Sequence, residues 1–548
     1  MRRHHSTTPR GPRTTRTSRA LGALLLVAAS GVLAAGAAPA AQAGQNGPAG
    51  RARAATPLDQ VIPAPASVRA GGAPYRITPA TRIRVDGTRE ARRVGDYLSG
   101  ILRPSTGYRL PVTTHGPAGI RLRLADGPFG AEGYRLDSGA RGVTITAREP
   151  AGLFHGVQTL RQLLPPAVEK RSVQPGPWPV AGGTVQDSPR YAYRGAMLDV
   201  SRHFFTVAQV KRYIDELALY KVNKLHLHLS DDQGWRIAVD SWPRLAAYGG
   251  STQVGGGPGG HYTKADYKEI VRYAASRYLE VVPEIDMPGH TNAALASYAE
   301  LNCDGKAPPL YTGTQVGFSS LCVPKEITYD FADDVLRELA ALTPGRYLHI
   351  GGDEAHSTSH DDYVKFMDRV QPIVAKYAKT VVGWHQLTGA TPAKGALAQY
   401  WGLDSTGAAE KAQVARAAQN GTWLVLSPAD RVYLDMKYTK DTPLGLAWAG
   451  YVEVRRSYDW DPGSYLPGAP ASAVRGVEAP LWSETLSTSA HIDYMAFPRL
   501  PGAAELGWSP AATHDWDAYK VRLAAQAPRW DALGIGYYRS PQVPWPGN

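Results

Sequence analysis

The feature that most constrains the fold is a rhythm that begins after Tyr191, where short apolar runs alternate with helical patterns. The eight runs are residues 195–200, 224–229, 279–285, 346–352, 380–384, 396–401, 422–427 and 474–482. The first helical segment begins at Val207, and Thr206 and Gln209 before and within it have the spacing of a capping box. Buried runs without polar alternation indicate a parallel sheet, and eight strand–helix units predict a (β/α)8 TIM barrel of the α/β class. A doubly wound sheet is the alternative, but neither a Gly-x-Gly-x-x-Gly motif after the first strand nor a P-loop supports it.

A smaller domain is expected before the barrel, over residues 58–189. Strands are expected at residues 75–85, 120–124 and 142–147, and helices at 89–102 and 151–164. This mixture predicts a small α+β domain. Residues 165–188 are rich in proline, glycine and polar side chains, which is typical of a linker or a domain boundary, and the barrel then occupies residues 190–548.

The first 43 residues have the composition of a secretory signal peptide. A segment with six arginines and no acidic residue, up to Arg19, precedes an apolar, alanine-rich run from Leu21 to about Ala40, and Ala41-Gln42-Ala43 fits a small-x-small cleavage site. A transmembrane anchor is the alternative, which the alanine-rich composition disfavours. We expect cleavage after Ala43, a disordered spacer over residues 44–57, and a secreted, extracellular protein without a membrane anchor.

The remaining composition narrows the class of protein. Without the leader's six arginines the formal net charge falls from +12 to +6, and no basic run interleaved with aromatic residues follows, so nucleic-acid binding has little support. The chain has two cysteines, Cys303 and Cys322. In an oxidising compartment a disulfide between them is the natural pairing. Two unpaired buried thiols are the alternative, and two cysteines alone do not complete a zinc site.

Acidic, histidine, arginine and tryptophan residues follow all eight strand runs. In strand order they are Asp199 with Arg202 and His203; Asp231 and Asp232; Glu284, Asp286 and His290; Asp353 and Glu354; Trp384 and His385; Trp401; Tyr433 and Asp435; and Trp482 and Glu484. The active sites of TIM barrels lie at these carboxyl ends. Carboxylates and an arginine that bind hydroxyls, beside tryptophans that stack on sugar rings, predict a carbohydrate pocket.

The fourth run ends in two adjacent acids that are expected to differ in their tasks. Successive residues of a strand face opposite sides, and Gly351 and Gly352 let the backbone turn directly before Asp353 and Glu354. If Glu354 is a general acid, Asp353 is badly placed to face it across a glycosidic bond as the nucleophile, which needs a separation of roughly 5 Å. Another group must therefore attack.

Five motifs carry a resemblance to a known family. They are RGAMLDVSRHF at residues 194–204, HLHLSDDQGWR at 226–236, PEIDMPGH at 283–290, HIGGDEAH at 349–356 and LWSE at 481–484. In their order and spacing they resemble family 20 glycoside hydrolases, the β-N-acetylhexosaminidases. The resemblance implies an exo-acting hydrolase, without cofactor or metal, that removes terminal N-acetylglucosamine or N-acetylgalactosamine from glycosides and chitooligosaccharides with retention.

The resemblance also implies a role for each motif residue. Glu354 is the general acid and base, and the substrate's own acetamido group, oriented by Asp353 and Tyr433, is the nucleophile. His290 and Asp231 lie behind Glu354. The residues implied in sugar binding are Arg202, Trp384, Trp401, Asp435, Trp448, Trp482 and Glu484.

Two other classes remain open from the residues alone. His226 and His228 have a spacing that places both rings on one face of a strand, as in barrel metallohydrolases, although no further histidine and lysine set completes a two-metal site. A carbohydrate-binding protein without activity is the second alternative, and the presence of both Asp353 and Glu354 argues against it. The sequence leaves the natural polymer, the choice between glucosamine and galactosamine substrates, and the oligomeric state undetermined.

Overall fold

The computed structural model describes residues 55–547. The predicted signal peptide and the spacer up to residue 54 lie outside the described residues. Within the described part of the chain, none of the helices is both long and apolar enough to span a membrane.

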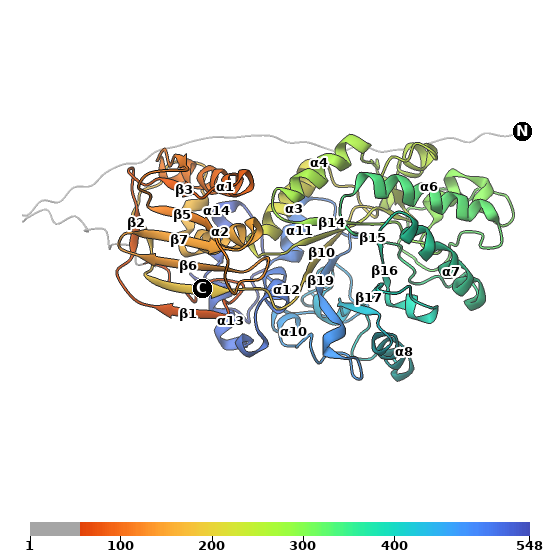
Figure 1. Ribbon diagram of the computed structural model, residues 1–548. Coiled ribbons are helices and arrows are strands. Elements are labelled where there is room, and N and C mark those ends of the chain that lie inside the picture. The colour runs from red at the N-terminus through yellow and green to blue at the C-terminus, as the bar shows by residue number, and fades with distance from the viewer. Residues whose placement is uncertain (1–54, 548) are drawn as a thin grey trace, which may run out of the picture. The chain divides into compact units, whose positions relative to one another are not determined.

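Eight parallel strands close into a barrel, which confirms the predicted fold (Figure 1). The strands are β10 (Tyr193–Asp199), β11 (Lys224–His228), β14 (Glu280–Glu284), β15 (Tyr347–His349), β16 (Thr380–Trp384), β17 (Leu397–Tyr400), β18 (Trp423–Leu426) and β19 (Val474–Leu481). Each of them overlaps one of the eight apolar runs. Closure comes from β10, which pairs with β11 on one side and with the last strand, β19, on the other.

Helices connect the barrel strands and follow the last of them. They are α3 (Val207–Leu219), α4 (Lys264–Ala275), α5 (Asn292–Ser297), α6 (Glu326–Leu342), α7 (His360–Lys376), α8 (Ala408–Gln419), α9 (Ala429–Val432), α10 (Val454–Tyr458), α11 (Ser489–Ala496), α12 (Arg499–Trp508), α13 (Trp516–Ala524) and α14 (Ala527–Leu533). The predicted capping box of α3 is present, because Thr206 and Gln209 exchange hydrogen bonds between side chain and backbone. A short hairpin of β12 (Ser230–Asp231) and β13 (Gly234–Trp235) follows β11.

The smaller domain is built on a seven-stranded sheet in the order β1-β9-β6-β7-β5-β3-β4. Its strands are β1 (Ser67–Ala70), β3 (Ile83–Val85), β4 (Val112–Thr113), β5 (Ile120–Leu124), β6 (Tyr134–Gly139), β7 (Gly142–Ala147) and β9 (Gly183–Asp187), and β2 (Tyr75–Ile77) pairs separately with β8 (Trp178–Val180). Helices α1 (Arg89–Thr106) and α2 (Pro150–Leu163) pack on the sheet. The prediction of an α+β domain is therefore confirmed.

The prediction that residues 165–188 form a linker is wrong. This stretch contains β8 and also β9, which lies inside the sheet between β1 and β6. Proline and glycine are tolerated at such strand positions, because Pro179 lies in the two-stranded β2–β8 pair and Gly183 is the first residue of β9. Turn-forming composition therefore concealed two short strands.

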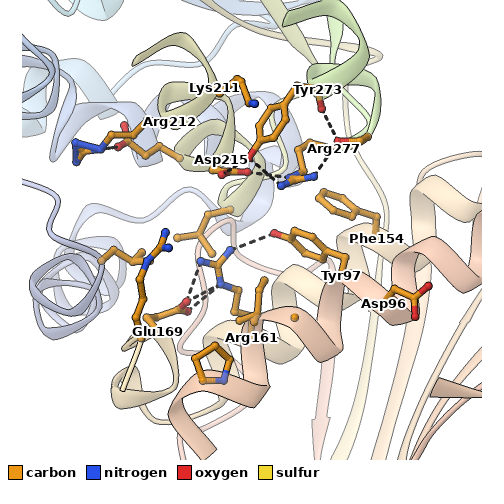
Figure 2. A pocket seen from close by; sticks show the side chains of 18 of the residues that line it. Asp96, Tyr97, Phe154, Arg161, Glu169, Lys211, Arg212, Asp215, Tyr273 and Arg277 are labelled. Atoms are coloured by element: carbon orange, nitrogen blue, oxygen red, sulfur yellow. Dashed lines mark hydrogen bonds and ion pairs between the residues drawn. The ribbon is translucent and has the colours of Figure 1, made fainter. Parts of the chain in front are cut away.

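Buried ion pairs line the groove between this domain and helices α3, α4 and α14, a cavity of about 1810 Å³. Figure 2 shows Arg161 reaching Glu169 and the hydroxyl of Tyr97. Arg529 of the α14 segment binds the same Glu169 carboxylate, and the two guanidinium groups hold the pKa of Glu169 below its ordinary value although burial alone would raise it. Glu169 and the two arginines therefore balance one another's charges at this interface.

Candidate active site

The carboxyl ends of the barrel strands bring the predicted polar and aromatic side chains to one rim. Asp353 and Glu354 follow β15, and His290 follows β14. Arg202 follows β10, and Asp231 follows β11. The parallel direction of all eight strands makes this convergence a consequence of the fold.

The two adjacent acids differ in burial, as the sequence led us to expect. The side chain of Asp353 is 9% exposed and that of Glu354 is 29% exposed. Burial raises the pKa of Asp353 to about 6, although His290 opposes this rise. Both acids nevertheless reach the same atom, His290 Nε2, at 3.7 Å from Asp353 Oδ2 and 3.3 Å from Glu354 Oε2.

The turn before the acids requires glycine. Gly351 has φ +66°, and a Cβ there would lie 1.7 Å from Asp286 Oδ1. Glu354 itself has φ +45° and His290 has φ +56°, a region that is costly for residues other than glycine. The two side chains that meet at 3.3 Å are thus both carried by left-handed backbone, which the surrounding structure must enforce.

A row of charges lies behind Glu354. His290 Nδ1 lies 3.1 Å from Asp231 Oδ1, and Arg202 Nη2 lies 2.9 Å from Asp231 Oδ2. Burial disfavours a charged imidazole, but Asp231 and Asp353 outweigh it and hold the pKa of His290 well above its ordinary value. Burial would also raise the pKa of Asp231, yet Arg202 and His290 hold it well below its ordinary value. The predicted His290–Asp231 pair is thus in contact with Glu354.

Aromatic rings form one wall of the site. Trp384 and Trp482 have ring centroids 5.7 Å apart, and Tyr433 lies 6.2 Å from Trp482. Trp448 contacts Trp401 and Tyr433 edge to face, both at 5.9 Å, and is 50% exposed. The buried rings and the half-exposed Trp448 ring thus form one aromatic cluster, called the aromatic slot below, that reaches solvent at Trp448.

Asp435 and Glu484 are neighbouring acids beside the aromatic rings, where Trp482 N–H donates to Asp435 Oδ1 at 3.3 Å. Burial and the neighbouring Glu484 raise the pKa of Asp435 well above its ordinary value, and burial raises the pKa of Glu484. Asp435 Oδ2 and Glu484 Oε2 are buried without a hydrogen-bond partner. Such atoms are costly unless a ligand supplies donors, so these two carboxyls are suited to bind hydroxyl groups.

Two sequence profiles match the chain: that of the glycosyl hydrolase family 20 catalytic domain over residues 191–511, and that of domain 2 of the same family over residues 59–188. The chain belongs to glycosyl hydrolase family 20. This confirms the family resemblance of the five motifs. The protein is a glycoside hydrolase of the β-N-acetylhexosaminidase type.

Relatives from several bacteria resemble this family 20 enzyme over most of its length. A β-N-acetylhexosaminidase of Cellulomonas fimi is 44% identical over 492 residues, which are 89% of this chain and 97% of the relative. The structure of the β-N-acetylhexosaminidase of Streptomyces coelicolor A3(2) is 81% identical with a TM-score of 0.90, and the match covers 90% of this chain and 100% of that chain. A mutant Streptomyces plicatus β-hexosaminidase in complex with its product N-acetylglucosamine is also 81% identical, with a TM-score of 0.89 and coverage of 90% and 99%.

The metallohydrolase alternative rested on His226 and His228, and both histidines have carboxylate partners in this family 20 enzyme. The two rings do lie on one face of β11, and both contact the carboxylate of Glu284. Among the described residues, four groups have potential metal ligands within 4.8 Å: His226, Glu284 and His349; His228, Glu284 and Asp286; Asp231, Asp232 and His290; and Asp286, His290 and Asp353. Each group contains a histidine–carboxylate contact, namely His226–Glu284, His228–Glu284, His290–Asp231 and His290–Asp353, which accounts for the proximity of these side chains.

Sequence reasoning named Glu284 and Asp286 at a strand end but gave them no task. Both are fully buried below the acid pair. Burial and the neighbouring Asp353 raise the pKa of Asp286 well above its ordinary value, and Asp286 Oδ1 accepts a hydrogen bond from Gly352 N–H at 3.0 Å. Their place in the PEIDMPGH motif, two residues apart and before His290, was the available signal.

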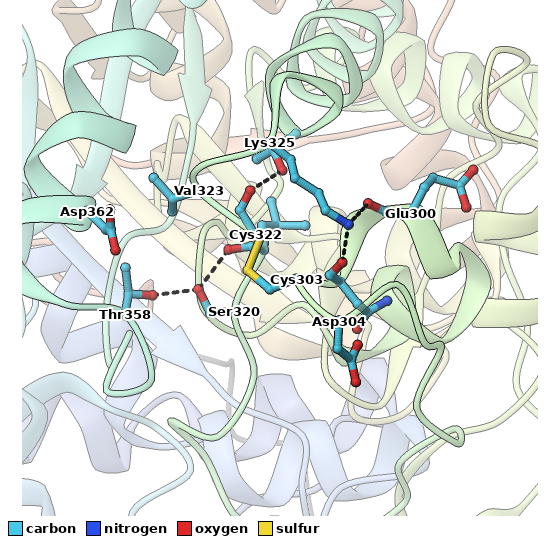
Figure 3. Close-up of a disulfide and its surroundings, with 12 residues drawn as sticks. Glu300, Cys303, Asp304, Ser320, Cys322, Val323, Lys325, Thr358 and Asp362 are labelled. Carbon is cyan, nitrogen blue, oxygen red and sulfur yellow. Dashed lines mark hydrogen bonds between the residues drawn. A yellow bond between two sulfur atoms is a disulfide. The ribbon is translucent and has the colours of Figure 1, made fainter.

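The predicted disulfide joins Cys303 and Cys322 and closes the loop between them (Figure 3). Figure 3 shows Lys325 next to it, whose Nζ donates to Asn302 O at 2.5 Å, and Ser320, which bonds Thr358. Within the loop, Ser319 Oγ donates to Asp232 Oδ1, and a Cβ on Gly317 would meet the His356 ring. The loop therefore rests directly against the strand ends that carry the site.

Proposed function

We propose that this family 20 enzyme removes terminal, non-reducing N-acetylglucosamine or N-acetylgalactosamine from β-glycosides and chitooligosaccharides by substrate-assisted, retaining hydrolysis. The observation that supports this most is the unequal burial of two adjacent carboxylates at one imidazole, beside a slot of aromatic rings. The more exposed carboxyl, Glu354, can reach a leaving group in the mouth of the slot. The buried one, Asp353, faces the interior. The bound N-acetylglucosamine of the Streptomyces plicatus relative fits this substrate class.

In the first step Glu354 gives its proton to the glycosidic oxygen as the bond from that oxygen to the anomeric carbon breaks. The carbonyl oxygen of the substrate's 2-acetamido group forms the new bond to the anomeric carbon, which yields an oxazolinium ion. In the second step Glu354 accepts a proton from water, whose oxygen attacks the same carbon and opens the ring. Two displacements at one carbon give net retention.

Asp353 would accept a hydrogen bond from the acetamido N–H and balance the positive charge that develops there. The Tyr433 hydroxyl would donate a hydrogen bond to the acetamido carbonyl oxygen. The two groups fix the nucleophile in position before the bond breaks, which is worth most in a site shielded from water. Tyr433 is buried and lies against Trp482, so its hydroxyl has little freedom to turn away.

The remaining predicted residues would bind the sugar ring. Trp384, Trp401 and Trp482 enclose the acetamido group, and Trp448 lies near the hydroxymethyl group. Arg202, Asp435 and Glu484 would bind ring hydroxyls, and the unpartnered oxygens of the two acids support this assignment.

We also propose the domain boundaries and the location expected from the sequence. These are a signal peptide over residues 1–43, a spacer to residue 57, an accessory domain over 58–189 and a catalytic barrel from residue 190. The Cys303–Cys322 disulfide fits an oxidising compartment and so supports secretion.

The test is release of an aryl alcohol from its N-acetyl-β-glucosaminide and, in parallel, from the plain β-glucoside, with and without a chelator. We expect hydrolysis of the first substrate only, unchanged by EDTA. Equal hydrolysis of both would remove the acetamido nucleophile from the mechanism. Loss of activity in EDTA that zinc restores would favour the metallohydrolase alternative, and absence of hydrolysis with intact sugar binding would favour the binding protein.

A further inference from the structure

Glu284, the last residue of β14, contacts rings from several neighbouring strands inside the barrel and is fully buried. Its Oε1 accepts a hydrogen bond from Trp384 Nε1–H at 2.8 Å. Its Oε2 contacts His226 Nε2 at 3.0 Å and, more closely, His228 Nδ1. His349 Nδ1 also lies 3.0 Å from Oε1. One carboxylate thus lies at the crossing of β11, β15 and β16.

The two histidines of β11 are each placed between two acids. His226 Nδ1 lies 2.8 Å from Glu478 Oε1, on the side away from Glu284. His228 Nε2 lies 2.7 Å from Asp231 Oδ2. An ionised carboxylate only accepts hydrogen bonds, so a ring that bridges two of them must donate from both nitrogens and be charged. Acids and imidazolium rings therefore alternate from Glu478 to Glu284 and on to Asp231.

This row continues to the general acid. Asp231 binds His290, and His290 Nε2 lies 3.3 Å from Glu354. On its other oxygen Glu284 holds the indole of Trp384, which forms the base of the aromatic slot. One oxygen of Glu284 thus contacts the row that leads to Glu354, and the other binds the Trp384 indole of the aromatic slot.

We propose that Glu284 is a positioning residue that fixes the Trp384 ring and the His228–Asp231–His290 row together. The inference rests on the proposed function, in which Trp384 encloses the acetamido group and His290 supports Glu354. Its consequence is that acetamido binding and proton donation are set by one group that touches neither the substrate nor Glu354.

Glu284→Gln tests this with little change of shape. An amide has one accepting oxygen and one donating nitrogen, so it cannot accept from Trp384 and from the histidines at once. The matched control is Glu478→Gln, which lies on the far side of His226 and outside the His228–Asp231–His290 row. Glu478 is equally buried and also binds His226, but its other partners are Tyr193 and Gln399, and it reaches neither Trp384 nor His228.

We expect both variants to melt at a lower temperature, because each leaves a buried imidazolium with one carboxylate fewer. Only Glu284→Gln should change the site. Its KM for an aryl N-acetylglucosaminide should rise, and its kcat should fall by about tenfold to a hundredfold, with the larger loss for the poorer leaving group. Glu478→Gln should keep both constants within about threefold of the parent. Equal kinetic losses in the two variants would overturn the proposal.

If Glu284→Gln does not fold, Trp384→Phe tests the same contact from the other side. It removes the indole donor and leaves the histidine row in place, so KM should rise while the dependence on leaving group stays as in the parent. An unchanged KM would overturn the proposal. Calorimetric binding of N-acetylglucosamine to the same variants does not require turnover. A parent protein that binds the sugar without hydrolysing the glycoside would refute the proposed function, while the binding comparison would still decide the role of Glu284.

Discussion

Replacing each of the two adjacent acids by its amide separates their tasks. In Glu354→Gln and Asp353→Asn an amide replaces a carboxylate of nearly the same size, so we expect the left-handed backbone at residue 354 to be kept. In Glu354→Gln the new amide can still lie beside His290 Nε2, which is 3.3 Å from the native carboxylate. The loss in this variant therefore reports the missing proton rather than a displaced side chain.

The expected magnitudes differ between substrates. Proton donation is typically worth about 10²- to 10⁴-fold, and a leaving group as acidic as a nitrophenol needs little of it. Glu354→Gln should therefore lose about 10³-fold or more on a disaccharide and far less on the nitrophenyl glycoside. Asp353→Asn removes a hydrogen bond to a charged group, worth roughly 1.5–3 kcal/mol, and should slow both substrates by a similar factor of about 10 to 100.

The assay compares kcat/KM of the two variants and the parent on an N-acetylglucosamine disaccharide and on its 4-nitrophenyl glycoside. Circular dichroism spectra and melting temperatures confirm that all three proteins are folded. Equal losses on both substrates in Glu354→Gln would refute the assignment of the acid. Mass spectrometry of the parent provides a second check, because a sugar ester trapped on Asp353 would show that an enzyme carboxylate is the nucleophile and that the acetamido group is not.

Two further predictions concern stability. The disulfide closes a loop with a sequence separation of 19, so replacing both Cys303 and Cys322 by serine should lower the free energy of unfolding by roughly 3 kcal/mol in urea denaturation. A thiol titration of the denatured, unreduced parent should find no free thiol, and two free thiols would contradict the disulfide. Burial disfavours the charged form of His226, but Glu478 and Glu284 raise its pKa to about 9, so its contribution is complete below the unfolded value of about 6.5 and is lost as the pH rises through 9. Urea midpoints should therefore fall between pH 6.5 and pH 9, with roughly 3 kcal/mol from this ring alone; a midpoint that is level or rises over this range would be the opposite result.

The barrel could be predicted from the sequence because its strands are buried on both faces and read as continuous apolar runs. The strands of the smaller domain were harder to find. β6 has the sequence YRLDSG, in which only alternate residues are buried, and β8 contains a proline that a two-stranded pair tolerates. Periodicity therefore found the strands that read as continuous apolar runs and missed short or half-exposed strands such as β6 and β8.

The same contrast holds in the site. A polar residue directly after an apolar run is visible in the sequence, and so the positions of Asp353, Glu354 and Arg202 were expected. The role of Glu284 depends on its contacts with His226 of β11 and Trp384 of β16, and these contacts exist only once the barrel has closed. Likewise, nothing in the residue types of Glu354 and His290 announces the positive φ angles that the structure assigns to them.

The pairing of the first barrel strand with the last one also determines when the enzyme can exist during synthesis. β10 begins at Tyr193, but its partner β19 ends at Leu481 and supplies Glu478 to the buried row and Trp482 to the slot directly after it. Ala64 N–H in the smaller domain likewise donates to Glu505, 441 residues later. A ribosome that has translated seven barrel strands has therefore made an open sheet with unpaired edges, in which His226 lacks one of its two carboxylates, Glu478. The site can therefore assemble only when translation is nearly complete or has ended. We expect a chain interrupted before that point to be inactive and to be bound by chaperones or degraded by proteases.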